Sequence, residues 1–88
     1  MNNTRRKALK SVLKTLEQAN ELIMQAVENL ENVLDEEEEA FDNMPESFQE
    51  SERGETMQEC IDNLGTVLDT VQEWDFEEIT DLLDEIIS

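Results

Sequence analysis

Apolar residues recur in a heptad over the first forty positions, and this pattern constrains the fold more than any other feature. Three heptad positions are apolar: one holds Leu9, Leu16, Ile23 and Leu30, the next Val12, Ala19, Ala26 and Val33, and the third Leu13, Val27 and Leu34. Such a stripe is wider than the seam of a two-stranded coiled coil. Because neither glycine nor proline precedes Pro45, it predicts one helix over residues 4 to 42, capped by Asn3 or Thr4.

The only proline of the chain marks the end of this helix. Pro45 disfavours helical geometry in Met44, whereas residues 45 to 49 are suited to one short helical turn. Ser51 is a good amino-terminal cap. We therefore expect a turn over residues 43 to 51 and a second long helix over residues 52 to 87. Gly54 and Gly65 weaken that helix without ending it.

The apolar stripe of the second helix changes phase near Asp75. It runs through Met57, Cys60, Ile61, Leu64, Val67, Leu68, Val71 and Trp74, and then through Phe76, Ile79, Leu82, Leu83 and Ile86. Asp75 and Glu78 have the spacing of a capping box, which indicates a bend or a third short helix. The alternative, which we slightly favour, is a continuous helix that absorbs the shift by local overwinding or underwinding.

Two long helices of similar length joined by a short turn predict an all-α fold. We expect a single domain over residues 1 to 88, a long antiparallel helical hairpin of coiled-coil type. Basic residues near the amino terminus and acidic residues near the carboxy terminus each oppose their own helix dipole, and antiparallel pairing would bring them together.

A two-helix hairpin covers only one side of each apolar stripe. The residues that we expect to lack partners within the hairpin are Leu13, Val27, Leu34, Ile61 and Leu68. A homodimer that forms a four-helix bundle would cover them. The alternative is that the stripe docks onto another protein.

The charge of the chain is strongly negative and unevenly distributed. It has 24 acidic and 6 basic residues, a net charge of −18 at pH 7, and five of the six cations lie between Arg5 and Lys14. So acidic a body is repelled by nucleic-acid phosphates and anionic membranes and is attracted to basic protein surfaces. We expect a protein partner, no direct nucleic-acid or membrane binding, and, without a long apolar run, a cytoplasmic protein.

The residue types that catalysis and metal binding require are scarce. The chain has no histidine, no tyrosine and one cysteine, so it lacks a general base near neutral pH and any histidine-containing metal set. Adjacent helical carboxylates, as in the run from Asp35 to Glu39, point about 100° apart and do not converge. Cys60 lies on the apolar stripe and is expected to be a buried packing residue. We expect no enzymatic activity, cofactor or metal.

The acidic stretch around the turn is the first candidate partner-binding surface. Its members are Asp35, Glu36, Glu38, Glu39, Asp42, Glu46, Glu50 and Glu52. Trp74 and Phe76 form a second, apolar candidate, because aromatic side chains anchor many interfaces. Phe41, Met44 and Phe48 are expected to form a small apolar plug beneath the turn.

The turn has a specific sequence, AFDNMPESFQESERGE, which is followed by CIDNLGTVLDTV. Within residues 31 to 71 it resembles small acidic uncharacterised helical-hairpin proteins of phages and prophages of Gram-positive bacteria, which share an N-x-P-E-S-x-Q-x-S-E-R turn. The matching residues of the turn include Pro45, Glu46, Ser47, Ser51, Glu52 and Arg53. The resemblance implies a non-enzymatic phage gene product in the cytoplasm of a bacterial host cell.

Charge and resemblance together suggest two functions. The first is a protein-binding inhibitor or modulator of a host protein, such as an antiphage-defence or nucleic-acid-binding protein, whose basic surface binds the acidic helices as a mimic of DNA. The alternative is a structural or scaffolding bundle that self-associates, in which the acids only maintain solubility.

Overall fold

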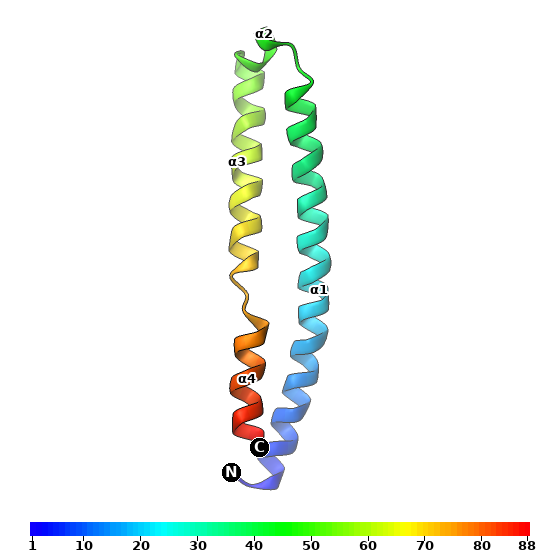
Figure 1. Ribbon diagram of the computed structural model, residues 1–88, viewed down its shortest axis with the longest axis vertical. Coiled ribbons are helices and arrows are strands. Elements are labelled where there is room, and N and C mark those ends of the chain that lie inside the picture. Colours follow the sequence, from blue (N-terminus) through cyan, green and yellow to red (C-terminus); the bar gives the residue numbers. More distant parts are fainter. The chain divides into compact units, whose positions relative to one another are not determined.

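The computed structural model describes residues 1–88 as four helices without strands. They are α1 (Asn3–Asp42), α2 (Glu46–Gln49), α3 (Glu52–Gln72) and α4 (Phe76–Ile87). Helices account for 88% of the chain. Figure 1 shows long helices that reverse direction at α2, which confirms the expected all-α helical hairpin.

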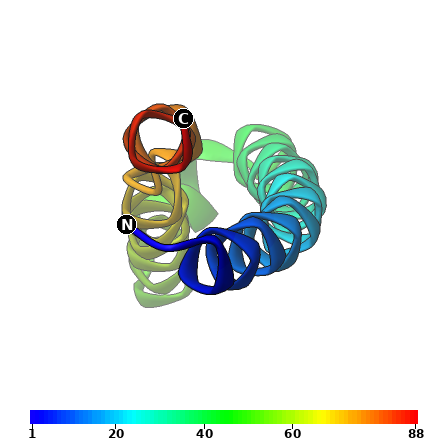
Figure 2. The same cartoon turned by 90° about the horizontal axis from the view of Figure 1, so that it is seen from below.

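The chain forms two compact units, and α1 contributes to both. Unit 1 comprises Met1–Gln25 and Trp74–Ser88, and unit 2 comprises Ala26–Glu73. In unit 1, α4 runs antiparallel to the beginning of α1, and both chain termini lie at the same end (Figures 1 and 2). In unit 2, α3 runs antiparallel to the end of α1. That the 88 residues act as a single domain stays a prediction.

The side of α1 that faces the returning helices follows a regular seam with alternating spacings of four and three residues. Its half-buried members are Leu9, Leu13, Leu16, Asn20, Ile23, Val27, Leu30, Leu34, Glu37 and Phe41. This is the two-position seam of a coiled coil, with a polar residue at two of its places. Packing therefore uses two of the three apolar heptad positions, and of the remaining position only Ala19 is half-buried.

The expectation of which apolar residues lack partners is wrong. Ile61, 8% exposed, is the only buried apolar side chain, and the other four are half-buried. The exposed members of the two stripes instead include Val12, Val33 and Val67, each 46% exposed, and also Leu82 and Ile86 of α4. The contact line on α1 follows Leu13 and not Val12. Because adjacent helical residues point about 100° apart, this difference turns the contact line by about 100° around the helix.

Short polar side chains cap the beginnings of the helices. Asn2 Oδ1 accepts a hydrogen bond from Arg5 N at 2.8 Å, so Asn2 caps α1 instead of the predicted Asn3 or Thr4. Ser51 is confirmed as the cap of α3, because its Oγ accepts from Gly54 N at 3.4 Å. Each cap satisfies a backbone N–H that has no partner within its own helix.

The turn between α1 and α3 is compact, and the predicted short helical turn is confirmed as α2. Gln49 Nε2 donates to Phe41 O at 2.9 Å, which ties α2 to the end of α1. Gly54 is buried, and a Cβ at this position would overlap the backbone oxygens of Gln49 and Phe48. Glycine therefore permits the close approach of α2 to the first turn of α3.

The three residues of the predicted apolar plug do not form one cluster. Met44 and Phe48 line one shallow groove, whereas Phe41 lines a different one. Phe48 is 55% exposed. The expectation of a plug beneath the turn is therefore wrong for Phe48, which lies exposed on α2, whereas Phe41 follows the α1 seam.

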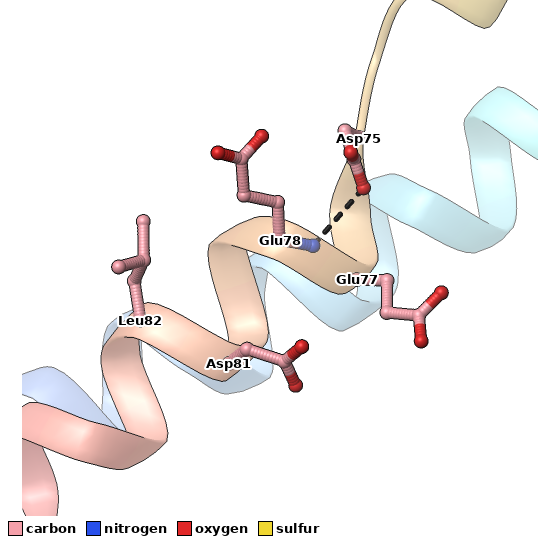
Figure 3. A pocket seen from close by; sticks show the side chains of 5 residues that line it. All are labelled: Asp75, Glu77, Glu78, Asp81 and Leu82. Atoms are coloured by element: carbon pink, nitrogen blue, oxygen red, sulfur yellow. Dashed lines mark hydrogen bonds between the residues drawn. The ribbon is translucent and has the colours of Figure 1, made fainter.

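A break separates α3 from α4, so the slightly favoured continuous helix over residues 52 to 87 is wrong. Asp75 has non-helical angles, φ −105° and ψ 86°, and its Oδ1 accepts from Glu78 N at 3.0 Å (Figure 3). Continuing the α3 seam from Leu68 and Val71 would place Asp75 and Glu78 on the inner side. The break restores apolar contact, because the half-buried residues of α4 include Phe76, Ile79 and Leu83.

Candidate protein-binding surfaces

The eight carboxylates predicted to bind a partner all lie around the turn of unit 2, and we call this set the acidic tip. Five lie in the last turns of α1, Glu46 begins α2, Glu50 follows α2, and Glu52 begins α3. The eight residues, all exposed, are Asp35, Glu36, Glu38, Glu39, Asp42, Glu46, Glu50 and Glu52. The turn at α2 thus brings carboxylates from three helices to one end of unit 2 (Figure 1).

The charge density of the acidic tip is comparable to that of a nucleic acid. The end of α1 carries six carboxylates between Asp35 and Asp42 when Glu37 is included. At a rise of ~1.5 Å per residue this is one negative charge per about 2 Å of helix axis, against ~1.7 Å for duplex DNA. Arg53 is the only cation of unit 2, so this charge is almost uncompensated.

The carboxylates of the acidic tip diverge from one another. No group of three or more cysteine, aspartate and glutamate side chains is arranged to hold a metal ion. Within the run from Asp35 to Glu39, Glu37 is half-buried in the seam whereas its neighbours are exposed. The arrangement suits an extended charged surface and not a chelating site.

Trp74 and Phe76, the second predicted surface, lie in unit 1 beside the helix break. Their rings stack with centroids 6.4 Å apart and an interplanar angle of 21°, and both residues are half-buried. Trp74 Nε1 donates to Asn20 Oδ1 at 3.0 Å. The aromatic pair therefore packs within unit 1, and a role in partner binding stays a prediction.

The beginning of α4 forms a shallow acidic depression. It has a volume of about 360 Å³ and is lined by Asp75, Glu77, Glu78, Asp81 and Leu82. Figure 3 shows Glu77 and Glu78 pointing to different sides of α4, with Asp75 engaged as the helix cap. Because its carboxylates diverge, this depression does not form a cation site.

A groove on one face of unit 2 was not anticipated from the sequence. It has a volume of about 460 Å³ and is lined by Val33, Glu37, Cys60, Asn63, Leu64 and Val67. Cys60 is exposed, so the expectation that it is a buried packing residue is wrong. Its neighbour Ile61 takes the seam position, and adjacent helical residues point about 100° apart. The sequence signal that could have revealed this groove was the seven-residue spacing of Cys60 and Val67, which places both residues on the same side of α3.

A second groove continues on the same helices toward the turn. It has a volume of about 300 Å³ and is lined by Ala40, Met44, Phe48, Arg53 and Met57. Both grooves of unit 2 are shallow and are lined mainly by apolar side chains, as many binding surfaces are.

None of the helices is long and apolar enough to span a lipid bilayer. Comparison of the chain with known proteins found no matching family model, no matching curated protein and no matching solved structure.

Proposed function

We propose that the chain is a non-enzymatic protein that binds a basic, nucleic-acid-binding surface of another protein through its acidic tip. In the phage setting that the turn motif implies, this partner is a host protein in the bacterial cytoplasm, such as an antiphage-defence protein. Occupation of its nucleic-acid site would inhibit or modulate it. The observation that supports this proposal is the set of eight exposed carboxylates with Arg53 as the only neighbouring cation.

The position of these acids supports a role beyond helix stability. Glu38, Glu39 and Asp42 lie near the carboxy end of α1, where negative charge opposes the helix dipole, and α1 has no basic residue in its last turn. Adjacent like charges add further repulsion. Each unfavourable interaction costs a few tenths of a kcal/mol. Solubility requires charge but not its concentration at this end of the helix.

The test compares two variants with the same change in net charge. The tip variant carries Glu38→Gln, Glu39→Gln, Asp42→Asn and Glu46→Gln. The control variant carries the equivalent change at exposed acids elsewhere on α1, namely Glu17→Gln, Glu21→Gln, Glu28→Gln and Glu31→Gln. Host proteins captured by the wild-type chain would be identified and their affinities measured against salt concentration and against duplex DNA as competitor.

We expect the tip variant to lose the partner and the control to retain it. Salt anions and duplex DNA should compete with the acidic tip, because all three neutralise the same basic groups of the partner. The affinity should therefore fall as salt rises, and DNA should displace the chain from its partner. A complex that is indifferent to salt, or that both variants weaken equally, would contradict binding by the acidic tip.

Exposed apolar side chains favour a second function, a structural bundle that self-associates as a homodimer. Val33 and Val67 are each 46% exposed and Phe48 is 55% exposed, and a second hairpin would cover such residues. In this case the acids serve solubility. Light scattering separates the two functions: a tight dimer that requires Val33 and Val67 favours the bundle, and a monomer favours the inhibitor.

A further inference from the structure

We infer that one face of unit 2 is a docking groove for a basic amphipathic helix of the partner protein. In this arrangement, apolar residues of the bound helix contact Val33 and Val67, and a lysine or arginine pairs with Glu37. The inference rests on the proposed function, since it gives the basic partner a defined contact in addition to the acidic tip.

The two shallow grooves of unit 2 form one row along the same face. On α1 the lining residues 33, 37 and 40 are spaced by four and three, and Met44 follows in the turn beyond the end of α1. On α3 the lining residues 53, 57, 60, 64 and 67 are spaced by four, three, four and three. Residues with this spacing share one side of a helix. We call the combined feature the apolar groove, and it is long enough for about three turns of a bound helix.

Several apolar side chains are exposed along the apolar groove. Val33 and Val67 are each 46% exposed and Phe48 is 55% exposed, and Cys60 is exposed beside them. The opposite face of the same helices differs, because its groove is lined by Glu38, Phe41, Asp42, Gln58 and Ile61. Apolar residues in a row on one side only are typical of a helix-binding groove.

Glu37 determines the charge of the occupant. It takes a place in the α1 seam that is apolar at most other turns, and it is half-buried beside Leu64. A docked helix would remove the Glu37 carboxylate from water, which is costly unless a cation or hydrogen-bond donor of the occupant faces it. The single cation of unit 2, Arg53, lines the other part of the apolar groove. A lysine or arginine on the incoming helix would supply the counter-charge.

A second copy of the chain fits this groove less well than a basic helix. A symmetric dimer across this face would bring two Glu37 carboxylates into one groove, and unit 2 of the second copy would supply only its own Arg53 as a cation. Each copy also carries a net charge of −18, which opposes close packing. Charge complementarity therefore favours the basic helix.

The test uses three synthetic peptides of about 18 residues and the full chain. The first has leucines at helical positions i, i+3, i+4 and i+7 and lysines on both flanks. The second has the same composition in an order that destroys the apolar stripe, and the third replaces each lysine with glutamate. Affinity is measured by calorimetry. We expect the first to bind at least about tenfold more tightly than the second, and the third not to bind.

Matched variants of the chain locate the site. Val67→Asp and Glu37→Gln alter the apolar groove, and Val12→Asp and Glu28→Gln make the same changes of charge outside both the groove and the acidic tip. Val12 and Val67 are equally exposed at 46%, so both aspartate variants should keep their helical content by circular dichroism. We expect each groove variant to lower the affinity for the first peptide about tenfold. The control variants should lower it by less than about twofold.

The failure of this inference is distinguishable from the failure of the proposed function. Equal binding of the first two peptides, or no effect of Val67→Asp, would overturn the groove while leaving the acidic tip to its own test. If the chain forms a dimer and Val67→Asp dissociates it, a second copy of the chain is the occupant of the groove. That result would also overturn the inference of a basic helix. If the groove variants lower the affinity for the peptide but the tip variant still binds its host partner, the result supports the groove and contradicts binding through the acidic tip.

Discussion

Trp74 Nε1 donates a hydrogen bond to Asn20 Oδ1 at 3.0 Å, and the two residues are 54 positions apart in the chain. Asn20 lies in the α1 seam, between turns that contribute Leu16 and Ile23. A polar residue in an apolar seam lowers stability but specifies register, because only one alignment gives it a partner. This hydrogen bond therefore sets where the segment leading into α4 meets α1 within unit 1.

Replacing Trp74 with phenylalanine should destabilise unit 1 through the lost donor. The ring remains, but Asn20 Oδ1 loses its partner in a half-buried position. We expect the free energy of unfolding to fall by about 1 to 2 kcal/mol in urea denaturation. Asn20→Leu and the double variant complete a thermodynamic cycle. Strictly additive effects would show that the hydrogen bond contributes nothing to stability.

Replacing Asp75 with alanine should weaken α4. The substitution removes the acceptor for Glu78 N, which Asp75 Oδ1 holds at 3.0 Å. Loss of such a cap costs about 1 kcal/mol, and the effect should appear as faster amide exchange in α4 by NMR. Asp75→Asn keeps an acceptor and should restore most of the protection. Asp81→Ala, an exposed position on the same helix, controls for charge, and equal effects at residues 75 and 81 would contradict the cap.

The two glycines of α3 should respond to alanine in opposite directions. At Gly54 a Cβ would overlap backbone oxygens of Phe48 and Gln49, whereas at Gly65 it would meet nothing within 4 Å. Gly54→Ala should lower the free energy of unfolding by about 2 to 3 kcal/mol through overpacking. Gly65→Ala should raise it by about 1 kcal/mol, because alanine favours the helix. Thermal denaturation of both variants measures the difference, and a loss at residue 65 would contradict the open surroundings there.

Cys60 should react with a maleimide in the native protein. Its side chain is exposed and lines the apolar groove, so denaturant should accelerate modification by only a few-fold. The basic amphipathic peptide should slow the reaction, and the peptide of the same composition without an apolar stripe should not. Mass spectrometry over time gives both rates. A thiol that reacts only after unfolding would contradict its exposure.

The hairpin and its main boundaries could be predicted from local signals. Pro45, the capping serine at residue 51 and the uninterrupted heptad of α1 act over a few residues, so they can be recognised without knowledge of the partner helix. The eight residues of the acidic tip could likewise be placed near the turn from helix length alone.

The seam and the helix break depended on contacts between helices. Val12 and Leu13 are both apolar, so the sequence does not show which of them faces α4, and the polar Asn20 conceals the seam that the structure uses. At Asp75 a continuous helix and a new cap agree equally with the local sequence. The half-burial of Phe76 and Leu83 in unit 1 decides between them, and the same uncertainty about the seam concealed the apolar groove beside Cys60.

The difference in length between α1 and α4 makes folding of the carboxy-terminal segment conditional. α1 has 40 residues and α4 has 12, and isolated helices of about 12 residues are marginal in water. The final helix therefore remains ordered only while the first 25 residues provide its apolar contact. We expect loss of the amino-terminal turns to melt a segment that lies more than seventy positions away in the sequence, so that the two chain ends unfold locally as one cooperative unit.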